Sequence, residues 1–319
     1  MKALTFDRFG GPEVLVYRDV ADPIPTAGQA LVRLRAIGLN FADVYRRQGH
    51  YHLAGDPPWI AGYEGSGEII SAPADSAFSV GDRVAFADAP FANAELVAVD
   101  VDRLIPLPDD IPHETAAALL LQGLTAQYLI RDSYSLRRDD TALVHAAAGG
   151  VGQLLVQLAK AAGARVIALA STEAKCDAAR RAGADATSTY DGDWIARVQG
   201  FAANGIDVAF DSVGRTVHDS LRAVRTGGAV VFYGMAGGDP EPVDPRVLMD
   251  GSKTLTGGDL WNVLRTAHDR RTRAAELFDA VRRGDLDVSI DSRFALSDGA
   301  AAHAHLESRR ALGKVLLIP

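Results

Sequence analysis

The stretch ALVHAAAGGVGQ, residues 142–153, decides the fold of this chain. Its apolar first part has β-strand character and stops at small residues and glycines, and a helical pattern over residues 154–162 follows. A strand that turns sharply into a helix leaves backbone N–H groups unpaired, and partial positive charge gathers at the helix start. The spacing Ala147-x-Gly149-x-x-Gly152 is a dinucleotide fingerprint with alanine in place of the first glycine, and small residues there let a pyrophosphate approach the backbone. The stretch therefore predicts a dinucleotide site.

Strands and helices alternate on both sides of this turn. The strands are predicted over residues 141–146, 164–170, 187–190, 206–212, 228–233 and 253–256, and the helices over residues 150–162, 173–182, 193–199 and 216–224. Apolar strands that alternate with helices at this spacing form a parallel sheet covered on both faces. The centre of the chain is therefore predicted to be a doubly wound α/β domain.

The first third of the chain has a different pattern, in which short strands are broken by glycine and proline turns. Residues 30–37 alternate apolar and charged side chains, as a half-buried strand does, and residues 41–48 form a predicted helix with Asn40 as its N-cap. After a long helical stretch over residues 260–283, the tail returns to strand, helix and strand. We therefore assign residues 1–118 and 262–319 to a β-rich domain and residues 119–261 to the cofactor domain.

Composition and charge exclude several classes of protein. Hydrophobic residues make up 48% and charged residues 23%, an ordinary globular balance, and the net charge of −8 argues against a nucleic-acid or anionic-membrane surface. No apolar run is long enough to span a bilayer, and the N-terminus lacks the apolar core of a signal peptide. The single cysteine, Cys176, excludes an intramolecular disulfide and a zinc site built from several thiolates. We expect a cytoplasmic protein with no nucleic-acid or membrane partner.

The residues after the second strand of the cofactor domain favour NADP(H) over NAD. An NAD site needs a carboxylate there to hold the ribose 2′-hydroxyl, whereas this strand ends in Ala170-Ser171-Thr172 and Lys175 follows one turn later. Hydroxyl groups and a lysine suit the anionic 2′-phosphate. The alternative is that Lys175 lies on a solvated helix face and that Ser171 or Thr172 only caps the helix.

Several further motifs together resemble one superfamily. They are Gly38-Leu39-Asn40-Phe41-Ala42-Asp43, Ala61-Gly62-Tyr63-Glu64-Gly65, Leu121-Gln122-Gly123-Leu124-Thr125, the glycine turn itself, Asp211-Ser212-Val213-Gly214 and the tail from Gly313 to Pro319. With these motifs the chain resembles, over its whole length, the medium-chain dehydrogenases/reductases, and among them the zeta-crystallin-like quinone oxidoreductases. The resemblance implies a β-rich, GroES-like catalytic domain and a Rossmann cofactor domain.

The zinc enzymes of this superfamily carry a cysteine where Asn40 stands and a histidine where Tyr63 stands. Neither Asn40 nor Tyr63 supplies a soft ligand for zinc, so we expect no metal. Glu64 remains from the motif, with a salt bridge or hydrogen bond as its expected structural role. Without a metal to activate an alcohol, reduction of a conjugated acceptor remains feasible, because conjugation stabilises the incoming charge and the protein supplies position and hydrogen-bond donors.

The resemblance also implies site residues. Four polar positions, Asn40, Asp43, Tyr45 and Tyr51, are expected to line the active-site cleft. Asn40 is expected as an orienting amide, Tyr45 beside the nicotinamide or acceptor, and Tyr51 as a donor to the acceptor oxygen. Asn40 as a simple helix cap and Tyr45 as ordinary core remain open alternatives. The expected cofactor-binding residues are Thr125, Ala148, Gly149, Gly150, Val151, Ser171, Thr172, Lys175, Tyr190, Ser212, Val213, Phe232, Gly234 and Lys314.

The sequence thus predicts a zinc-free, NADPH-dependent quinone oxidoreductase whose partner is a small quinone or enone. A 2-alkenal or enoyl reductase of the same superfamily is the alternative enzyme. An NADPH-binding structural or RNA-binding protein is the alternative from a different class, against which the acidic charge and the intact polar residues argue. Residues 253–256 are a candidate edge strand, and pairing of two such edges would give the homodimer common in the family.

Overall fold

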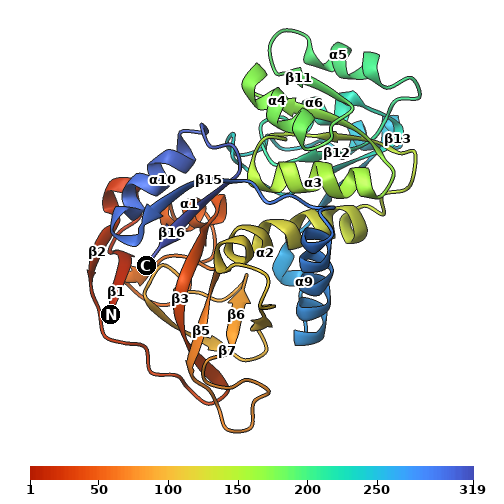
Figure 1. Ribbon diagram of the computed structural model, residues 1–319. Coiled ribbons are helices and arrows are strands. Elements are labelled where there is room, and N and C mark those ends of the chain that lie inside the picture. Colours follow the sequence, from red (N-terminus) through yellow and green to blue (C-terminus); the bar gives the residue numbers. More distant parts are fainter. The chain divides into compact units, whose positions relative to one another are not determined.

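The computed structural model describes all residues, 1–319, and they form two compact units. Unit 1 comprises Met1–Leu121, Leu264–Asp279 and Val288–Pro319, and unit 2 comprises Gln122–Val263 and Ala280–Asp287. Both chain termini lie in unit 1 (Figure 1). None of the helices has the length and hydrophobicity that crossing a bilayer requires.

The two units differ in detail from the predicted domain division, which stays a proposal. The tail from residue 262 onward is predicted to lie wholly in the β-rich domain, whereas Ala280–Asp287 belongs to unit 2. Gln157 is one reason, because its amide accepts a hydrogen bond from the backbone N–H of Asp287 at 2.7 Å and donates one to the Asp287 carbonyl at 3.0 Å. These two hydrogen bonds depend on a side-chain amide, which a hydropathy pattern does not reveal.

A six-stranded parallel sheet forms the centre of unit 2, so the predicted doubly wound α/β class is confirmed. The strands are β9 (Thr141–Val144), β10 (Arg165–Ala170), β11 (Ala186–Thr189), β12 (Ile206–Asp211), β13 (Val224–Phe232) and β14 (Thr254–Gly257). Their order is β11-β10-β9-β12-β13-β14, with Val144 of β9 paired to Ala168 of β10 and to Phe210 of β12. The order reverses at β9, and ligands of such sheets bind outside the carboxyl ends of the strands at that switch point.

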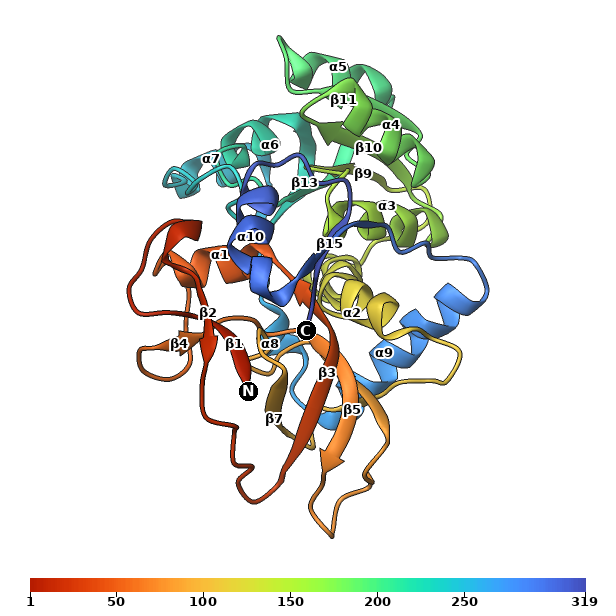
Figure 2. The ribbon, with the colours of Figure 1, turned by 60° about the vertical axis from the view of Figure 1, so that its left-hand side comes forward.

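Helices cover both faces of this sheet. They are α3 (Gly150–Ala161), α4 (Glu173–Arg181), α5 (Trp194–Phe201) and α6 (Val217–Ala223), and Figure 2 shows α3 and α6 on opposite sides of the strands. Leu143, Ile167 and Val230 have no exposed surface, as expected for strands buried on both faces. The short helix α7 (Pro245–Gly251), which the sequence analysis did not predict, begins at Asp244, whose carboxylate accepts from the Arg246 N–H.

Unit 1 contains two sheets, and the end of the chain pairs there with strands of its first third. The larger sheet has the order β15-β16-β3-β5-β6-β8, and β7 also pairs with β3; the smaller sheet has the order β2-β1-β4. Val315 of β16 pairs antiparallel with Leu39 of β3, which brings the C-terminus beside the N-terminal strands. The strands are β1 (Lys2–Phe6), β2 (Val16–Asp19), β3 (Gln29–Leu39), β4 (Trp59–Ile60), β5 (Gly65–Ser71), β6 (Arg83–Phe86), β7 (Leu96–Asp100), β8 (Ile105–Pro106), β15 (Ile290–Ala295) and β16 (Lys314–Ile318).

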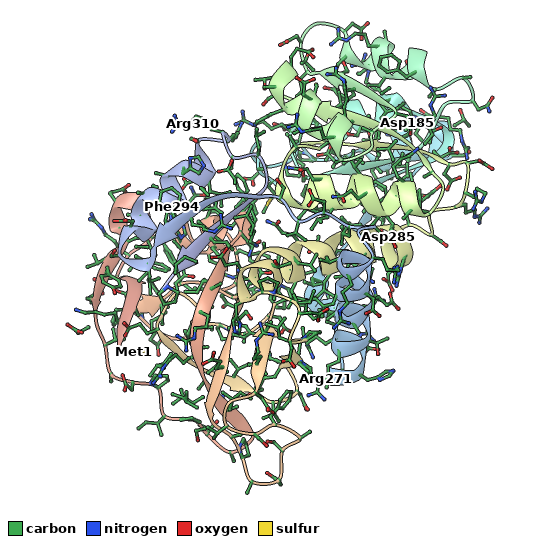
Figure 3. The ribbon with its side chains drawn as sticks, viewed as in Figure 1. Met1, Asp185, Arg271, Asp285, Phe294 and Arg310 are labelled. Atoms are coloured by element: carbon green, nitrogen blue, oxygen red, sulfur yellow. The ribbon has the colours of Figure 1, made fainter.

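The predicted continuous helix over residues 260–283 is wrong. The segment forms a single turn, α8 (Leu260–Val263), and then α9 (Ala267–Arg282). Arg270 explains the interruption, because its buried guanidinium donates to the carbonyls of Leu264 and Thr266 at 2.7 and 3.3 Å and so holds the connecting loop out of helical conformation. The neighbouring Arg271, labelled in Figure 3, donates to the Leu104 carbonyl at 3.0 Å and fixes α9 within unit 1.

Two more helices belong to unit 1, and a third begins there. They are α1 (Phe41–Arg47), α10 (Gly299–Glu307) and α2 (His113–Tyr128), of which residues up to Leu121 lie in unit 1. Asn40 occupies the N-cap of α1 as predicted, and its backbone N–H donates to the Asp43 carboxylate at 2.9 Å.

Candidate active site

The glycine turn of unit 2 has the form that the fingerprint requires. β9 ends at Val144, Gly149 is the N-cap of α3, and the backbone between them crosses the carboxyl edge of the sheet. A Cβ atom at Gly152 would lie 2.5 Å from the Ala146 carbonyl oxygen, so only glycine lets the helix approach the strand this closely. The residues present therefore fit a dinucleotide, with the expected Ala148, Gly149, Gly150 and Val151 at the start of the helix.

The alanine in place of the first fingerprint glycine has a structural explanation. Ala147, which takes the place of the first glycine, has no positive φ, so this position does not need glycine. The residue before it, Ala146, is the alanine with a positive φ, +47°. Three consecutive backbone N–H groups hold this part of the turn: His145 donates to the Phe210 carbonyl at 3.1 Å, Ala146 to the Tyr190 hydroxyl at 3.1 Å and Ala147 to the Leu169 carbonyl at 3.0 Å. The turn is thus attached to β10, to β12 and to the residue after β11.

Ser171, Thr172 and Lys175 follow β10 at the same edge of the sheet. Thr172 is the N-cap of α4, and its hydroxyl oxygen accepts from the Lys175 N–H at 3.3 Å, so the capping role that remained open is present. Ser171 is exposed and Lys175 half-buried. The capping bond uses only the oxygen of Thr172 as an acceptor, so its hydroxyl hydrogen is available for a phosphate oxygen.

Tyr190 lies beneath the glycine turn. Its hydroxyl oxygen accepts the Ala146 N–H and lies 3.3 Å from Nδ1 of His145. Burial raises the pKa of this phenol far above its ordinary value, so the hydroxyl stays protonated. The observed contacts of the hydroxyl are with the turn itself, whereas the sequence analysis expects Tyr190 to bind the cofactor.

The loops after β12 and β13 complete this edge. Ser212 and Val213 follow β12, and their carbonyls accept the N–H groups of Ala236 and Gly237 at 3.0 and 2.8 Å. A Cβ atom at Gly234 would lie 3.2 Å from the Ser212 carbonyl oxygen, so the two loops are closely packed. Phe232 is the last residue of β13. The structure thus brings these expected residues to the edge that carries the glycine turn.

Gln122 of α2 lies against the start of α3, whereas sequence reasoning singled out Thr125 of the same helix. Thr125 is nearly buried, as is Gln122. A Cβ atom at Gly150 would overlap the Gln122 amide, so this glycine makes room for that side chain. The signal for Gln122 was its position in the motif that also supplied Thr125.

A second group of polar residues lies buried in unit 1. The Lys314 ammonium donates to Glu64 Oε2 at 2.5 Å and to Asn40 Oδ1 at 2.8 Å, and the Asn40 amide donates to Glu64 Oε2 at 2.9 Å. Glu64 Oε1 accepts the Leu121 N–H at 2.7 Å, which confirms the structural ion-pair and hydrogen-bond role expected for Glu64. Lys314, expected at the cofactor, is 1% exposed and lies in this cluster.

Arg46 is a site residue that the sequence analysis missed. Its guanidinium carbon lies 3.5 Å from the centre of the Tyr63 ring and 5.0 Å from that of Tyr51. Its Nε donates to the His52 carbonyl at 3.1 Å and its Nη1 to Asp43 Oδ1 at 3.2 Å. The buried arginine therefore holds the loop that carries Tyr51, and only the three-dimensional packing reveals this role.

The remaining acidic residue and tyrosine of α1 complete the group. Burial raises the pKa of Asp43, while Arg46 and the Asn40 N–H act against that shift. Tyr45 is half-buried, with its ring 6.3 Å from that of Phe41. The structure therefore places all three expected catalytic residues, Asn40, Tyr45 and Tyr51, on α1 or in the segments beside it.

The residues of unit 1 do not fit zinc. The positions of the expected ligands hold an amide, Asn40, and a phenol, Tyr63, whose hydroxyl accepts the Ala54 N–H at 3.1 Å. The Glu64 carboxylate is already neutralised by the Lys314 ammonium, and the Asp43 carboxylate pairs with Arg46. Nowhere in the chain do three His, Cys, Asp or Glu side chains gather in an arrangement that could hold a metal ion.

Comparisons with known proteins connect both units to dehydrogenases. Residues 26–130 match the family described as alcohol dehydrogenase GroES-like domain, and residues 150–279 match the family described as zinc-binding dehydrogenase. A quinone oxidoreductase of Pseudomonas aeruginosa is 41% identical over 100% of this chain and 99% of its own length. A 2-haloacrylate reductase of a Burkholderia species is 34% identical over 99% of this chain and 98% of its own length. The Escherichia coli quinone oxidoreductase complexed with NADPH superposes with a TM-score of 0.96, at 33% identity and full coverage of both chains.

Proposed function

The chain belongs to the medium-chain dehydrogenase/reductase family, within its quinone oxidoreductases, and from this premise we propose that it transfers a hydride from NADPH to a quinone. The single observation that carries the proposal is the similarity to quinone oxidoreductases along the whole chain, at 41% identity for the Pseudomonas aeruginosa relative. The glycine turn supports it, because the residues there fit a dinucleotide.

We propose that unit 2 holds NADPH, which supplies the hydride when bound. The backbone N–H groups from Ala148 to Val151 at the start of α3 suit the pyrophosphate. Ser171, Thr172 and Lys175 suit the 2′-phosphate, because two hydroxyl groups and an ammonium can donate to its oxygens. Thr125, Ser212, Val213, Phe232 and Gly234 are the proposed neighbours of the rest of the cofactor, and Tyr190 acts by supporting the turn.

The residues of unit 1 are proposed to bind and polarise the acceptor. Tyr51 donates a hydrogen bond to the acceptor oxygen, on which negative charge develops during reduction, and Arg46 holds Tyr51 in place. Asn40 is held by Glu64 and Lys314, so we propose that Lys314 acts through Asn40 rather than on the cofactor. Tyr45 is proposed to pack against the reacting rings. A quinone needs no stronger activation, because conjugation distributes the charge.

A conjugated carbonyl or carboxylate alkene is the second candidate acceptor. The observation that favours it is the 34% identity to the 2-haloacrylate reductase of Burkholderia, over nearly the full length of both chains. The same hydride chemistry applies to both acceptors. The NADPH-binding structural or RNA-binding alternative is disfavoured by the net charge of −8 and by the fully bonded arrangement around Asn40.

We also propose a cytoplasmic homodimer. β14 is an edge strand of the parallel sheet, and pairing of two such edges across a twofold axis would cover both. Val247 and Met249 of the preceding helix are 45% and 71% exposed, an apolar surface that suits an interface. The single cysteine, Cys176, is free and buried, which suits a reducing compartment.

The test is the loss of NADPH absorbance in the presence of 1,4-benzoquinone and, separately, of an enal and 2-chloroacrylate. We expect turnover with the quinone, and a higher kcat/KM for an alkene would favour the second candidate. NADPH binding without turnover of any acceptor would support the binding-protein alternative and contradict the proposal.

A further inference from the structure

A chain of hydrogen bonds runs from the glycine turn to a buried carboxylate of unit 2. The Tyr190 hydroxyl lies 3.3 Å from His145 Nδ1, His145 Nε2 lies 3.0 Å from the Ser220 hydroxyl, and that hydroxyl lies 2.7 Å from Asp211 Oδ2. His145, Ser220 and Asp211 have no exposed surface. These hydrogen-bonded residues support the glycine turn and are not among those proposed to touch the cofactor.

The direction of each bond follows from the charge at its far end. Burial acts to raise the pKa of Asp211, but the pKa is lowered overall, with hydrogen bonds from Ser220, Thr216 and the Gly214 N–H acting against burial, so the carboxylate is ionised and only accepts. The Ser220 O–H therefore donates to Asp211, and its oxygen accepts from His145.

The histidine tautomer is then determined. Burial lowers the pKa of His145, so the ring is neutral and carries one proton, which must lie on Nε2 to reach Ser220. Nδ1 is consequently an acceptor for the Tyr190 O–H. The Tyr190 oxygen keeps its lone pairs for the Ala146 N–H at 3.1 Å.

This series of hydrogen bonds reaches the glycine turn at Ala146. Its φ of +47° costs an alanine free energy that glycine would not lose. The hydrogen bond to Tyr190 holds the Ala146 N–H, and the Ala146 carbonyl accepts the N–H of Gly149, the N-cap of α3. The orientation of the helix start therefore depends on a residue in a strained conformation.

We infer that His145, as its Nε2–H tautomer, is a positioning residue for NADPH: it transmits the orientation set by Asp211 and Ser220 through Tyr190 to Ala146. The inference rests on the proposed function, since it assumes that the turn binds NADPH. It assigns to a buried histidine a role in cofactor affinity although the ring touches no cofactor.

Matched variants of the two hydroxyl groups on Asp211 test the inference. Thr216 and Ser220 each donate to Asp211 Oδ2 at 2.7 Å, but only Ser220 also contacts His145. We expect Ser220→Ala to raise the Kd of NADPH about five- to tenfold, as loss of one hydrogen bond would. Thr216→Ala should leave it within about twofold, and the KM of the quinone should change in neither variant.

A double-mutant comparison separates a connected chain from local damage. Tyr190→Phe should raise the Kd of NADPH as Ser220→Ala does. The double variant should have a Kd no higher than that of Tyr190→Phe alone. Fold losses that multiply, or equal losses in Ser220→Ala and Thr216→Ala, would overturn the inference while leaving the proposed function intact. A wild-type protein that does not bind NADPH would instead overturn both.

The tautomer has its own readout, independent of cofactor. In a long-range ¹H–¹⁵N spectrum of ¹⁵N-histidine-labelled protein, with His145 assigned through its absence in His145→Gln, we expect the proton on Nε2 and none on Nδ1. Because the tautomer is read in the wild-type protein and needs neither Ser220→Ala nor Tyr190→Phe, it remains decisive even where one of those two variants fails to fold. A proton on Nδ1, or on both nitrogens, would contradict the inference.

Discussion

Lys175 carries the proposed preference for NADPH over NADH. Lys175→Ala removes a cation from the segment after β10, so we expect the KM of NADPH to rise at least about tenfold, as loss of a charged hydrogen bond does. The KM of NADH, which has no 2′-phosphate, should change little. Arg180→Ala is the matched control, because Arg180 lies on the same helix and pairs with Glu173 and Asp177. Equal changes for both coenzymes would refute the assignment of Lys175.

His303 on α10 makes stability depend on pH. The ring is fully buried, neither nitrogen has a hydrogen-bond partner, and burial, with Arg47 nearby, lowers its pKa to about 3. In the unfolded chain the His303 ring binds a proton below about pH 6.5, whereas in the folded state the ring stays neutral there. The free energy of unfolding therefore falls as the pH falls through 6.5. Between pH 6.5 and pH 5 the expected loss is ~2 kcal/mol.

His303→Leu tests this pH dependence. We expect the variant to keep most of its thermal midpoint between pH 7 and pH 5, whereas the wild type loses several degrees. His268→Leu, at an exposed position of α9, should follow the wild type. Parallel curves for wild type and His303→Leu would show that other groups cause the acid sensitivity.

At the residue scale, the sequence indicated which residue types the site contains better than it indicated which residues contact one another. The glycines, the absent carboxylate after Ala170 and the missing soft zinc ligands were all visible in residue types. The positive φ at Ala146 and the position of Arg46 over Tyr63 were not, because both arise from packing between segments far apart in the chain.

At the scale of elements, the ion pair of Lys314 and Glu64 connects β16 with the residue before β5 and, through the Leu121 N–H, with α2. Glu64→Gln leaves a buried ammonium without its counter-charge, and we expect a loss of about 3 kcal/mol in the free energy of unfolding. The double variant Glu64→Gln with Lys314→Met removes both charges and should be the more stable of the two. Denaturation midpoints measure both, and a single variant as stable as the double one would contradict the prediction.

The sequence predicted most elements, and its errors have physical causes. Periodicity located every strand of the parallel sheet, and the central strands β9, β10 and β12 are almost wholly buried and read as apolar runs. The interruption between α8 and α9 was missed, because it depends on the side chain of Arg270, which donates to the loop carbonyls. The helix α7 was missed because its apolar residues, 247–249, are consecutive rather than spaced at helical intervals, and none of its residues is buried.

At the scale of the whole molecule, the proposed dimer depends on the free edge of β14. Thr254→Lys places a charge on this exposed edge and should convert the dimer into monomer in analytical ultracentrifugation. Thr226→Lys adds the same charge at another exposed position and should leave the dimer intact. A monomeric wild type, or a dimer that survives Thr254→Lys, would rule out this interface.

Metal-independent hydride transfer from NADPH to a quinone is tested most directly by one assay. The protein is dialysed against a zinc chelator, and NADPH oxidation with 1,4-benzoquinone is then measured for wild type and Tyr51→Phe. We predict that the wild type keeps its full rate after chelation and that Tyr51→Phe loses about tenfold or more in kcat, as removal of a donor to a developing oxyanion does. Loss of wild-type activity on chelation with recovery on added zinc would contradict it.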